Sequence, residues 1–404
     1  MIRRMTCLLL SLLILVLALS GCWGKREVES LGFVFGIGID KGSKPGSYLI
    51  TFQIGSPKEA DEGGNNIQDY TISAEGSSMR EATDKIYNTI IKHPFVGTTK
   101  VVIIGEELAR EGINSVLDYI QRYYQFRRST YLVLAEGSAK DLLNIKLRTG
   151  KLVSLSLLDD IEKNDWLANF PRVRLGHYLT ELGNESTAPV IPLAHEIAPG
   201  KENIQYESQD GEEPQEVHIS GMGVFAGDKL YAVLGDEETR GFMWLQGEVK
   251  YRVLSTKIGN EQDNFWISAR VIKAKTNWKL QNNEGKPGIH YKIGITTDLD
   301  ELSAEQQQRS PEEYLQFVKN SSTAFNALVK AECDAALQKS YELGLDFLGI
   351  GRKLEQRNSR YWKQIKDQWQ QVMPGVPVTV SIDNKVESGG SSFNPPTNPV
   401  GSGQ

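Results

Sequence analysis

The chain begins with a basic and then apolar segment that stops at a cysteine. Arg3 and Arg4 precede an apolar run from Cys7 to Leu19. That run is too short for a membrane-spanning helix, which needs about 20 residues. A short apolar run between a basic start and small residues is typical of a cleaved signal peptide. We therefore expect the folded protein to follow this leader.

The end of the leader has the pattern of a bacterial lipoprotein cleavage site. Leu19, Ser20 and Gly21 stand directly before Cys22. The small residues fit a protease that cuts between Gly21 and Cys22, and the Cys22 thiol can carry a diacylglycerol. We predict signal cleavage between Gly21 and Cys22 and lipidation of Cys22, which would hold the protein on a lipid bilayer. The alternative is an ordinary signal peptide that happens to precede a cysteine.

Charge and cysteine usage restrict the class of protein further. The formal net charge is −6, so the chain lacks the basic footprint of a nucleic-acid-binding protein. If Cys22 is lipidated, Cys333 is the one thiol left in the mature chain, and no intramolecular disulfide can form. Cys333 has helical spacing with Phe325, Val329 and Leu337, which predicts a buried core residue; a reactive or intermolecular thiol is the alternative.

Strand and helix patterns alternate along the chain, and its 404 residues are enough for two or three domains. We predict an α+β (mixed α/β), multi-domain fold. The predicted segments are a lipoprotein signal peptide at 1–21, an N-terminal α/β domain at 22–200, an acidic linker at 201–216, a small middle domain at 217–260, a C-terminal α/β domain with a long helix at 261–387, and a disordered tail at 388–404.

Several helix boundaries have local signals. Ser78 and Ser138 are predicted N-caps. Pro311 follows a serine and precedes two glutamates, so it predicts the start of a long helix that ends at Gly344, with a possible break near 320–323. A helix from Glu106 is expected to bend near Gly112 and run to residue 124. A single helix over 359–372 would place Trp362 and Trp369 on one side, as core residues or, alternatively, as a ligand-stacking pair.

No local signature of catalysis or metal binding is present. The five histidines lack metal-ligand spacing, and there is no HExxH, CxxC or EF-hand pattern. The pairs Gly36/Gly38 and Gly349/Gly351 each lack the third glycine of a nucleotide loop, so we interpret both as structural glycines within strands. We predict no catalytic residue, no cofactor and no metal.

Four segments, taken together, resemble a known family. They are GCWGKREVESLGFVFGIGID near the start, VVIIGEELAREGINSVLDYI, GMGVFAGDKLYAVLGDEETRGFMWL, and GLDFLGIGRKLEQRNSRYWKQIKDQWQQV near the end. In this order they resemble the Ger(x)C spore germination proteins, the lipoprotein C subunits of nutrient germinant receptors. Two departures are Gly24, where an acidic residue or Asn is commoner, and Ser359, where Pro often precedes the first Trp.

The resemblance implies three mixed sheet-and-helix domains and a non-enzymatic subunit on the outer face of the spore inner membrane. Its partners would be the receptor's A and B membrane subunits, and Cys22 would be the lipidated residue. No ligand-binding residue follows from the resemblance. Two other hypotheses are a substrate-binding lipoprotein of an importer and an enzyme of the cell envelope.

Overall fold

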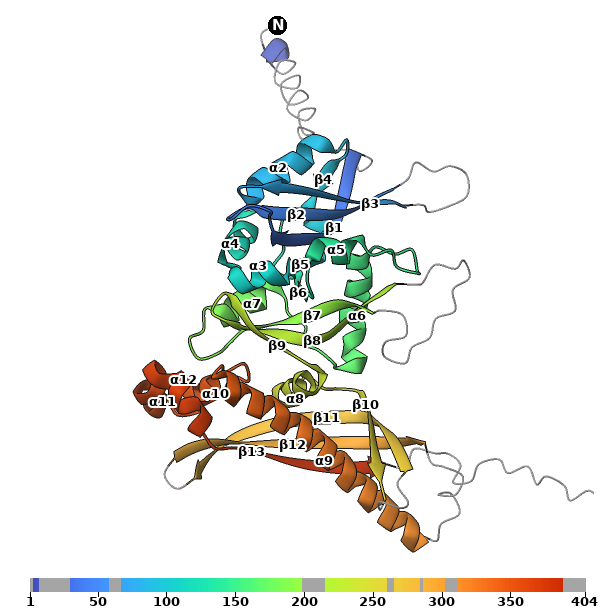
Figure 1. Cartoon of the computed structure of the whole chain (residues 1–404), viewed down its shortest axis with the longest axis vertical. Coiled ribbons are helices and arrows are strands. Elements are labelled where there is room, and N and C mark those ends of the chain that lie inside the picture. Colours follow the sequence, from blue (N-terminus) through green and yellow to red (C-terminus); the bar gives the residue numbers. More distant parts are fainter. Residues whose placement is uncertain are drawn as a thin grey trace, which may run out of the picture.

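The structure is a computed structural model that describes residues 3–6, 30–57, 67–197, 215–259, 265–283, 286–301 and 311–387. The strands in this part of the chain form two separate sheets, each with its own helices. The two sheets lie one after the other along the long axis of the molecule (Figure 1). The predicted α+β, multi-domain fold class is confirmed. Gly21, Cys22, most of the acidic linker and the predicted disordered tail lie outside the described residues. None of the described helices has the length and apolar character needed to cross a bilayer.

The first sheet is a mixed sheet of nine strands. Parallel pairing joins β1 to β4 and β5, β5 to β6, and β6 to β7, whereas antiparallel pairs occupy the two ends. The order is β3 (Ile67–Gly76), β2 (Tyr48–Pro57), β1 (Leu31–Lys41), β5 (Val101–Gly105), β6 (Tyr131–Ala135), β7 (Val190–Ile197), β8 (Glu216–Ala226) and β9 (Lys229–Leu234), with β4 (His93–Phe95) beside β1.

Helices cover both faces of the first sheet. Its central strands are continuous apolar runs, as expected when both faces are buried. In β5, Val102 and Ile104 face one core, while Val101 and Ile103 face the other. The first core is closed by α2 (Met79–Thr89), α3 (Glu106–Glu111), α4 (Asn114–Arg122) and α7 (Leu175–Leu182), and the second by α5 (Ala139–Asn144) and α6 (Val153–Leu167).

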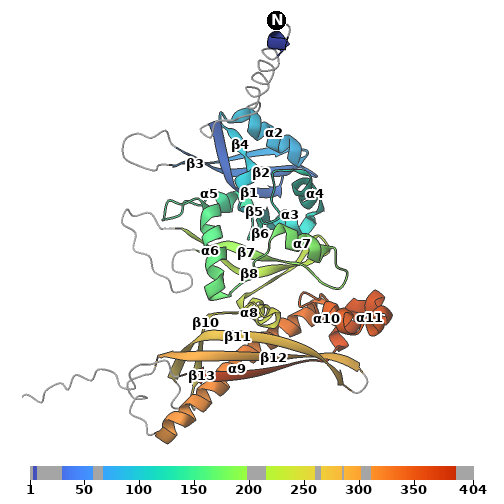
Figure 2. The same cartoon turned by 180° about the vertical axis from the view of Figure 1, so that it is seen from behind.

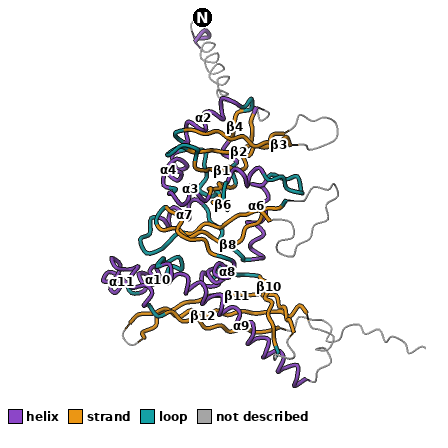
Figure 3. The backbone as a smooth tube through the Cα atoms, viewed as in Figure 1, coloured by secondary structure: helices purple, strands orange, loops and turns teal. Residues whose placement is uncertain are grey.

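The second sheet has four strands and a covered inner face. Its order is β10 (Arg252–Ile258), β11 (Phe265–Asn283), β12 (Lys286–Glu301) and β13 (Val378–Glu387), with only the β12–β13 pair parallel. The long helix α9 (Pro311–Leu343) crosses the sheet, and α8 (Asp236–Gln246) lies between the two sheets (Figures 1 and 3). The remaining short helices are η2 (Val96–Thr98), α10 (Ile350–Arg357), α11 (Ser359–Ile365), η5 (Lys366–Gln368), α12 (Trp369–Val372) and η6 (Met373–Gly375).

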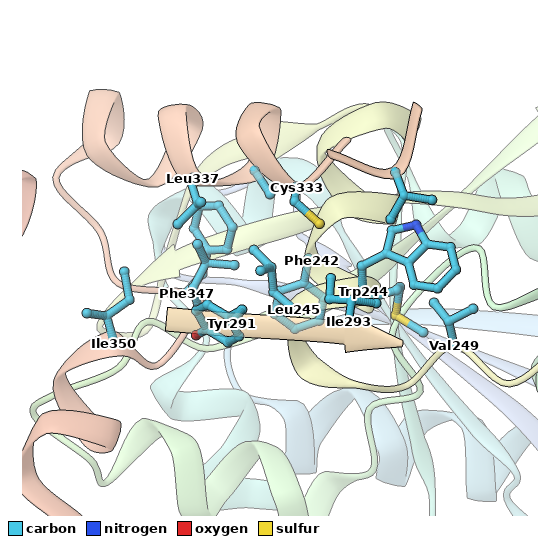
Figure 4. Close-up of a cluster of buried hydrophobic side chains, with 14 of the residues drawn as sticks. Phe242, Trp244, Leu245, Val249, Tyr291, Ile293, Cys333, Leu337, Phe347 and Ile350 are labelled. Atoms are coloured by element: carbon cyan, nitrogen blue, oxygen red, sulfur yellow. The ribbon is translucent and has the colours of Figure 1, made fainter. Parts of the chain in front are cut away.

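We call the first sheet with α2 to α7 the first half, and the second sheet with α8 to α12 the second half. The elements of the second half share one core. Trp244 of α8, Tyr291 of β12 and Cys333 of α9 are all completely buried in it (Figure 4). The prediction that Cys333 is a buried core residue is confirmed, and burial raises the pKa of its thiol. Trp362 and Trp369 are also buried core residues, as predicted, with ring centroids 5.2 Å apart.

Several local predictions differ from the structure. The helix over 359–372 is broken into α11, η5 and α12, whereas α9 continues through 320–323. Gly349 and Gly351 are structural glycines, as predicted, but they belong to the start of α10 and not to a strand. Residues 217–260 contribute to both sheets, since β8 and β9 complete the first and β10 belongs to the second. The domain boundaries stay a prediction.

Candidate functional site

The residues predicted from the sequence as a site are Gly21 and Cys22. Both lie outside the described residues, so cleavage and lipidation stay predictions. Within the described ranges, no group of His, Cys, Asp and Glu side chains is arranged to hold a metal ion. A concave feature lies instead where the first sheet with its helices meets the second sheet with its helices.

A cleft of about 330 Å³ is lined by residues of both halves. α7 and the following loop supply one wall, and α8 and the start of α10 supply the other. A second hollow of about 260 Å³ adjoins it, because Thr187, Ala188 and Pro189 line both. The titratable side chains in the first cleft are Arg172, His177, Glu181, Glu248, Arg352 and Lys353, and they lie beside the aromatic rings of Tyr178, Phe242 and Phe347.

Glu181 is the centre of the polar contacts across this cleft. Its Oε2 accepts a hydrogen bond from Arg352 Nη2 at 2.6 Å and one from Thr187 Oγ1 at 3.2 Å. A backbone hydrogen bond, Ala188 N to Asp346 O at 2.9 Å, crosses the same junction. These contacts are made by residues far apart in the sequence. They tie α7 of the first half to α10 of the second.

The side chain of Asp346 caps the start of α10, although Asp346 precedes the helix by four residues. Its two carboxylate oxygens accept hydrogen bonds from the backbone N–H groups of Ile350 at 2.8 Å and Gly351 at 2.6 Å. Asp346 is only 5% exposed, and burial raises its pKa to about 6 although the two hydrogen bonds oppose that rise. The side chain therefore acts as the N-cap that the preceding Gly349 cannot supply.

The two glycines explain why this turn fits. Gly349 adopts φ +66, a left-handed conformation that favours glycine. A Cβ on Gly351 would lie 2.9 Å from atoms of both Trp362 and Trp369, so only glycine lets α10 pack on the two rings. Next in the helix, Lys353 Nζ donates to Leu348 O at 2.9 Å and lies 5.6 Å from the Tyr291 ring centroid. Burial lowers the pKa of Lys353 to about 8.

In the first half, an aspartate of β1 caps a helix in the same way. Asp40, at the end of the strand, accepts hydrogen bonds from the backbone N–H groups of Ala139 at 2.7 Å and Lys140 at 2.8 Å, and so caps α5. Gly36 and Gly38 are strand glycines, as predicted; a Cβ on Gly36 would lie 2.4 Å from Ser154 Cβ. Sequence reasoning missed both aspartates as caps. The available signal was an Asp close to each Gly-Ile-Gly, but neither lies directly before its helix.

The two halves are joined at this cleft by hydrogen bonds and ion pairs. Arg352 and Lys353 are engaged with Glu181 and with Leu348 O, and His177 Nε2 lies 3.5 Å from Glu181 Oε1. The interactions fix the position of one half against the other.

Comparison with known proteins identifies the class. The family model described as "Spore germination protein N-terminal domain" matches residues 24–196, and "Spore germination B3/GerAC like, C-terminal" matches residues 220–390. The chain therefore belongs to the GerAC family of spore germination proteins. The family resemblance noted in the sequence is confirmed.

Individual relatives span nearly the whole chain. "Spore germination protein KC" of Bacillus subtilis is 27% identical over 411 residues, covering 98% of each chain. "Spore germination protein B3" of the same organism is 23% identical and covers 92% of this chain and 95% of its own. The crystal structure of the GerBC protein matches with a TM-score of 0.54 at 20% identity, covering 87% of this chain and 96% of that one. That structural likeness supports the fold.

Proposed function

We propose that this protein is a membrane-anchored lipoprotein subunit of a spore nutrient germinant receptor and acts through protein–protein contacts, not catalysis. The observation that carries the proposal is the match of both family models, which together span 24–390 with a short gap. Relatives named as spore germination proteins align over almost the full length. The hydrogen bonds and ion pairs between the two halves also suit a protein that works by binding other proteins.

The anchor follows from the sequence before the first strand. Gly21 and Cys22 form the cleavage and lipidation site, and diacyl attachment at Cys22 would provide two buried chains. Two acyl chains give stable membrane attachment because each buried CH₂ contributes about 0.8 kcal/mol. The protein would stand on the outer face of the spore inner membrane, beside the receptor's A and B membrane subunits.

The test is a Cys22→Ala variant produced at normal levels in sporulating cells. We expect it to lose incorporation of labelled palmitate, to leave the membrane fraction, and to fail to support germination in response to nutrient. Cys333→Ala is the matched control, because it also removes a cysteine but should keep the lipid label. Normal germination by Cys22→Ala spores with normal protein levels would contradict the anchored-subunit proposal.

The partners can be tested in the same cells. Affinity purification of the tagged, wild-type protein from detergent-solubilised spore membranes is expected to recover the A and B subunits. Recovery of neither subunit, from membranes that contain both, would argue against a shared receptor complex.

A further inference from the structure

The outer face of the second sheet carries a set of exposed basic side chains. One face of this sheet packs on α8 and α9, which leaves alternate residues of β10 to β13 on the opposite side (Figures 1 and 2). We call this side the basic face. The basic residues on it include Lys257, Arg270, Lys273, Lys275, Lys279, Lys292 and Lys385.

The sign of this face is opposite to that of the whole chain, whose formal net charge is −6. The acidic residues on the face are Asp298, in register with Arg270, and Asp383 and Glu387 of β13. Lys385, also on β13, forms an ion pair with Glu387 at 2.8 Å. The lysines of β11 and Lys292 are therefore the main source of positive charge on this side.

Large apolar side chains are exposed at one end of the basic face. Trp266 is 65% exposed and Val253 is 58% exposed, on neighbouring strands. Lys257 Nζ lies 5.1 Å from the Trp266 ring centroid. An indole and an aliphatic side chain next to lysines form an amphipathic surface, which suits the boundary between water and an apolar phase.

Protection of a strand edge explains only part of this pattern. β10 pairs with β11 only from Phe265 to Val271, so the rest of β11 is an edge, and lysines on an edge discourage pairing with other chains. Lys292, however, lies on β12, which is paired on both sides. Trp266 and Val253 lie in the paired region. Edge protection gives no reason to expose them.

We propose that the basic face binds the surface of a bilayer that contains anionic phospholipid. Lysines predominate, and a lysine ammonium is a compact point charge that suits a diffuse array of headgroups, whereas arginine favours bidentate partners. Polybasic segments are attracted to anionic leaflets in this way. Trp266 would enter the headgroup region, where indole rings are enriched in membrane proteins. The proposal does not depend on lipidation at Cys22.

The experiment uses the mature chain with Cys22→Ser, so that no lipid is attached. Its co-sedimentation is measured with vesicles of phosphatidylcholine alone and of phosphatidylcholine mixed with phosphatidylglycerol, at low and high salt. We expect binding only to the anionic vesicles and weaker binding at high salt, because salt screens surface charges. Replacement of Lys273, Lys275, Lys279 and Lys292 by Gln should weaken binding at least tenfold.

The matched control replaces the same number of exposed lysines elsewhere, namely Lys100, Lys229, Lys319 and Lys363, by Gln. This control should bind anionic vesicles as the parent does, and thermal unfolding should show that both variants fold. Trp266→Ser should reduce the part of the binding that survives at high salt. Absence of binding to anionic vesicles, or equal loss in both lysine variants, would overturn the proposal.

Two further outcomes separate this inference from others. If the face binds an acidic protein instead, vesicle binding will be the same in both lysine variants while recovery of the A or B subunit falls only in the basic-face variant; that result also overturns the proposal. Loss of palmitate labelling in Cys22→Ala tests the anchor alone. Failure of either proposal is therefore recognisable without the other.

Discussion

At the scale of single residues, two buried aspartates cap helices from positions outside the helix. Asp346 replaces the side chain that Gly349 lacks, and Asp40 adds to the cap made by Ser138. Asp40 caps α5 and Asp346 caps α10, each by accepting two backbone hydrogen bonds at its helix start. Each aspartate is close in sequence to a Gly-Ile-Gly, in which Gly36, Gly38 and Gly351 allow close packing and Gly349 allows a positive φ. In both segments the aspartate and the nearby glycines therefore position a helix.

Burial of Asp346 predicts a specific pH dependence of stability. Its pKa rises from 3.8 in the unfolded chain to about 6, so the folded state holds the proton more tightly. The resulting stabilisation is fully present below pH 3.8 and is lost as the pH rises through about 6. The difference in unfolding free energy between wild type and Asp346→Asn should therefore fall by about 2 to 3 kcal/mol over this range.

Urea unfolding of both proteins at several pH values measures this difference. Asn at position 346 does not titrate, so the subtraction removes the effect of all other carboxylates. A difference that grew with rising pH would show that hydrogen bonding to the charged form outweighs burial.

At the scale of elements, a buried ionic cluster joins α9, α8 and β10. Glu332 has a side chain only 3% exposed, and it accepts hydrogen bonds from both terminal nitrogens of Arg252 at 2.8 and 3.0 Å. Arg240 Nε at 2.9 Å and Trp244 Nε1 at 2.8 Å complete its partners. Burial lowers the pKa of Arg252, an effect that the Glu332 charge opposes. The long helix is thus fixed in register against its neighbours.

Loss of one partner should be worse than loss of both. Glu332→Leu leaves Arg252 buried without its carboxylate, which should cost about 3 to 5 kcal/mol of unfolding free energy. The double variant Glu332→Leu/Arg252→Leu should recover part of that loss, because the buried guanidinium is removed while the buried Trp244 Nε1 still lacks its acceptor. Urea unfolding measures both. A double variant as unstable as the single one would mean that packing, not charge, determines the cost.

The predictability of the elements follows from where their signals lie. The N-caps Ser78 and Ser138 were predicted correctly, since each accepts a hydrogen bond from a backbone N–H three residues later. α10 was missed because its cap, Asp346, lies outside its first turn and its N-cap residue is the glycine at 349. Strand order was also beyond local patterns, since β1 pairs with β2, β4 and β5 through long-range contacts.

The candidate site was less predictable than the fold for the same reason. Glu181 and Arg352 meet across 171 positions of sequence, and no local pattern marks the two as partners. Lipidation of Cys22 could be predicted, and stays a prediction, because its signal is a local sequence. The cleft could not be predicted in this way, because its lining residues come together only when both sheets have folded.

At the scale of the whole molecule, the ion pair between Glu181 and Arg352 should couple the two halves. The side chains are 16% and 33% exposed, so part of their attraction is screened by water. A double-mutant cycle with Glu181→Gln and Arg352→Gln should give a coupling free energy of about 1 kcal/mol. The exposed pair Lys385–Glu387 is a control that should give nearly zero. Equal coupling in both cycles would show that the junction pair adds no connection between the halves.

The position of β1 has a consequence for force applied to the protein. β1 is the first described strand, and it lies inside its sheet with β2 along one edge and β4 and β5 along the other. A pull from the N-terminal side acts along the strand, while its ladder hydrogen bonds run across that direction. Such a pull loads many bonds at once in shear instead of opening them one after another. The first half would therefore resist unfolding when it is pulled from its N-terminal side, and the force would reach the whole sheet.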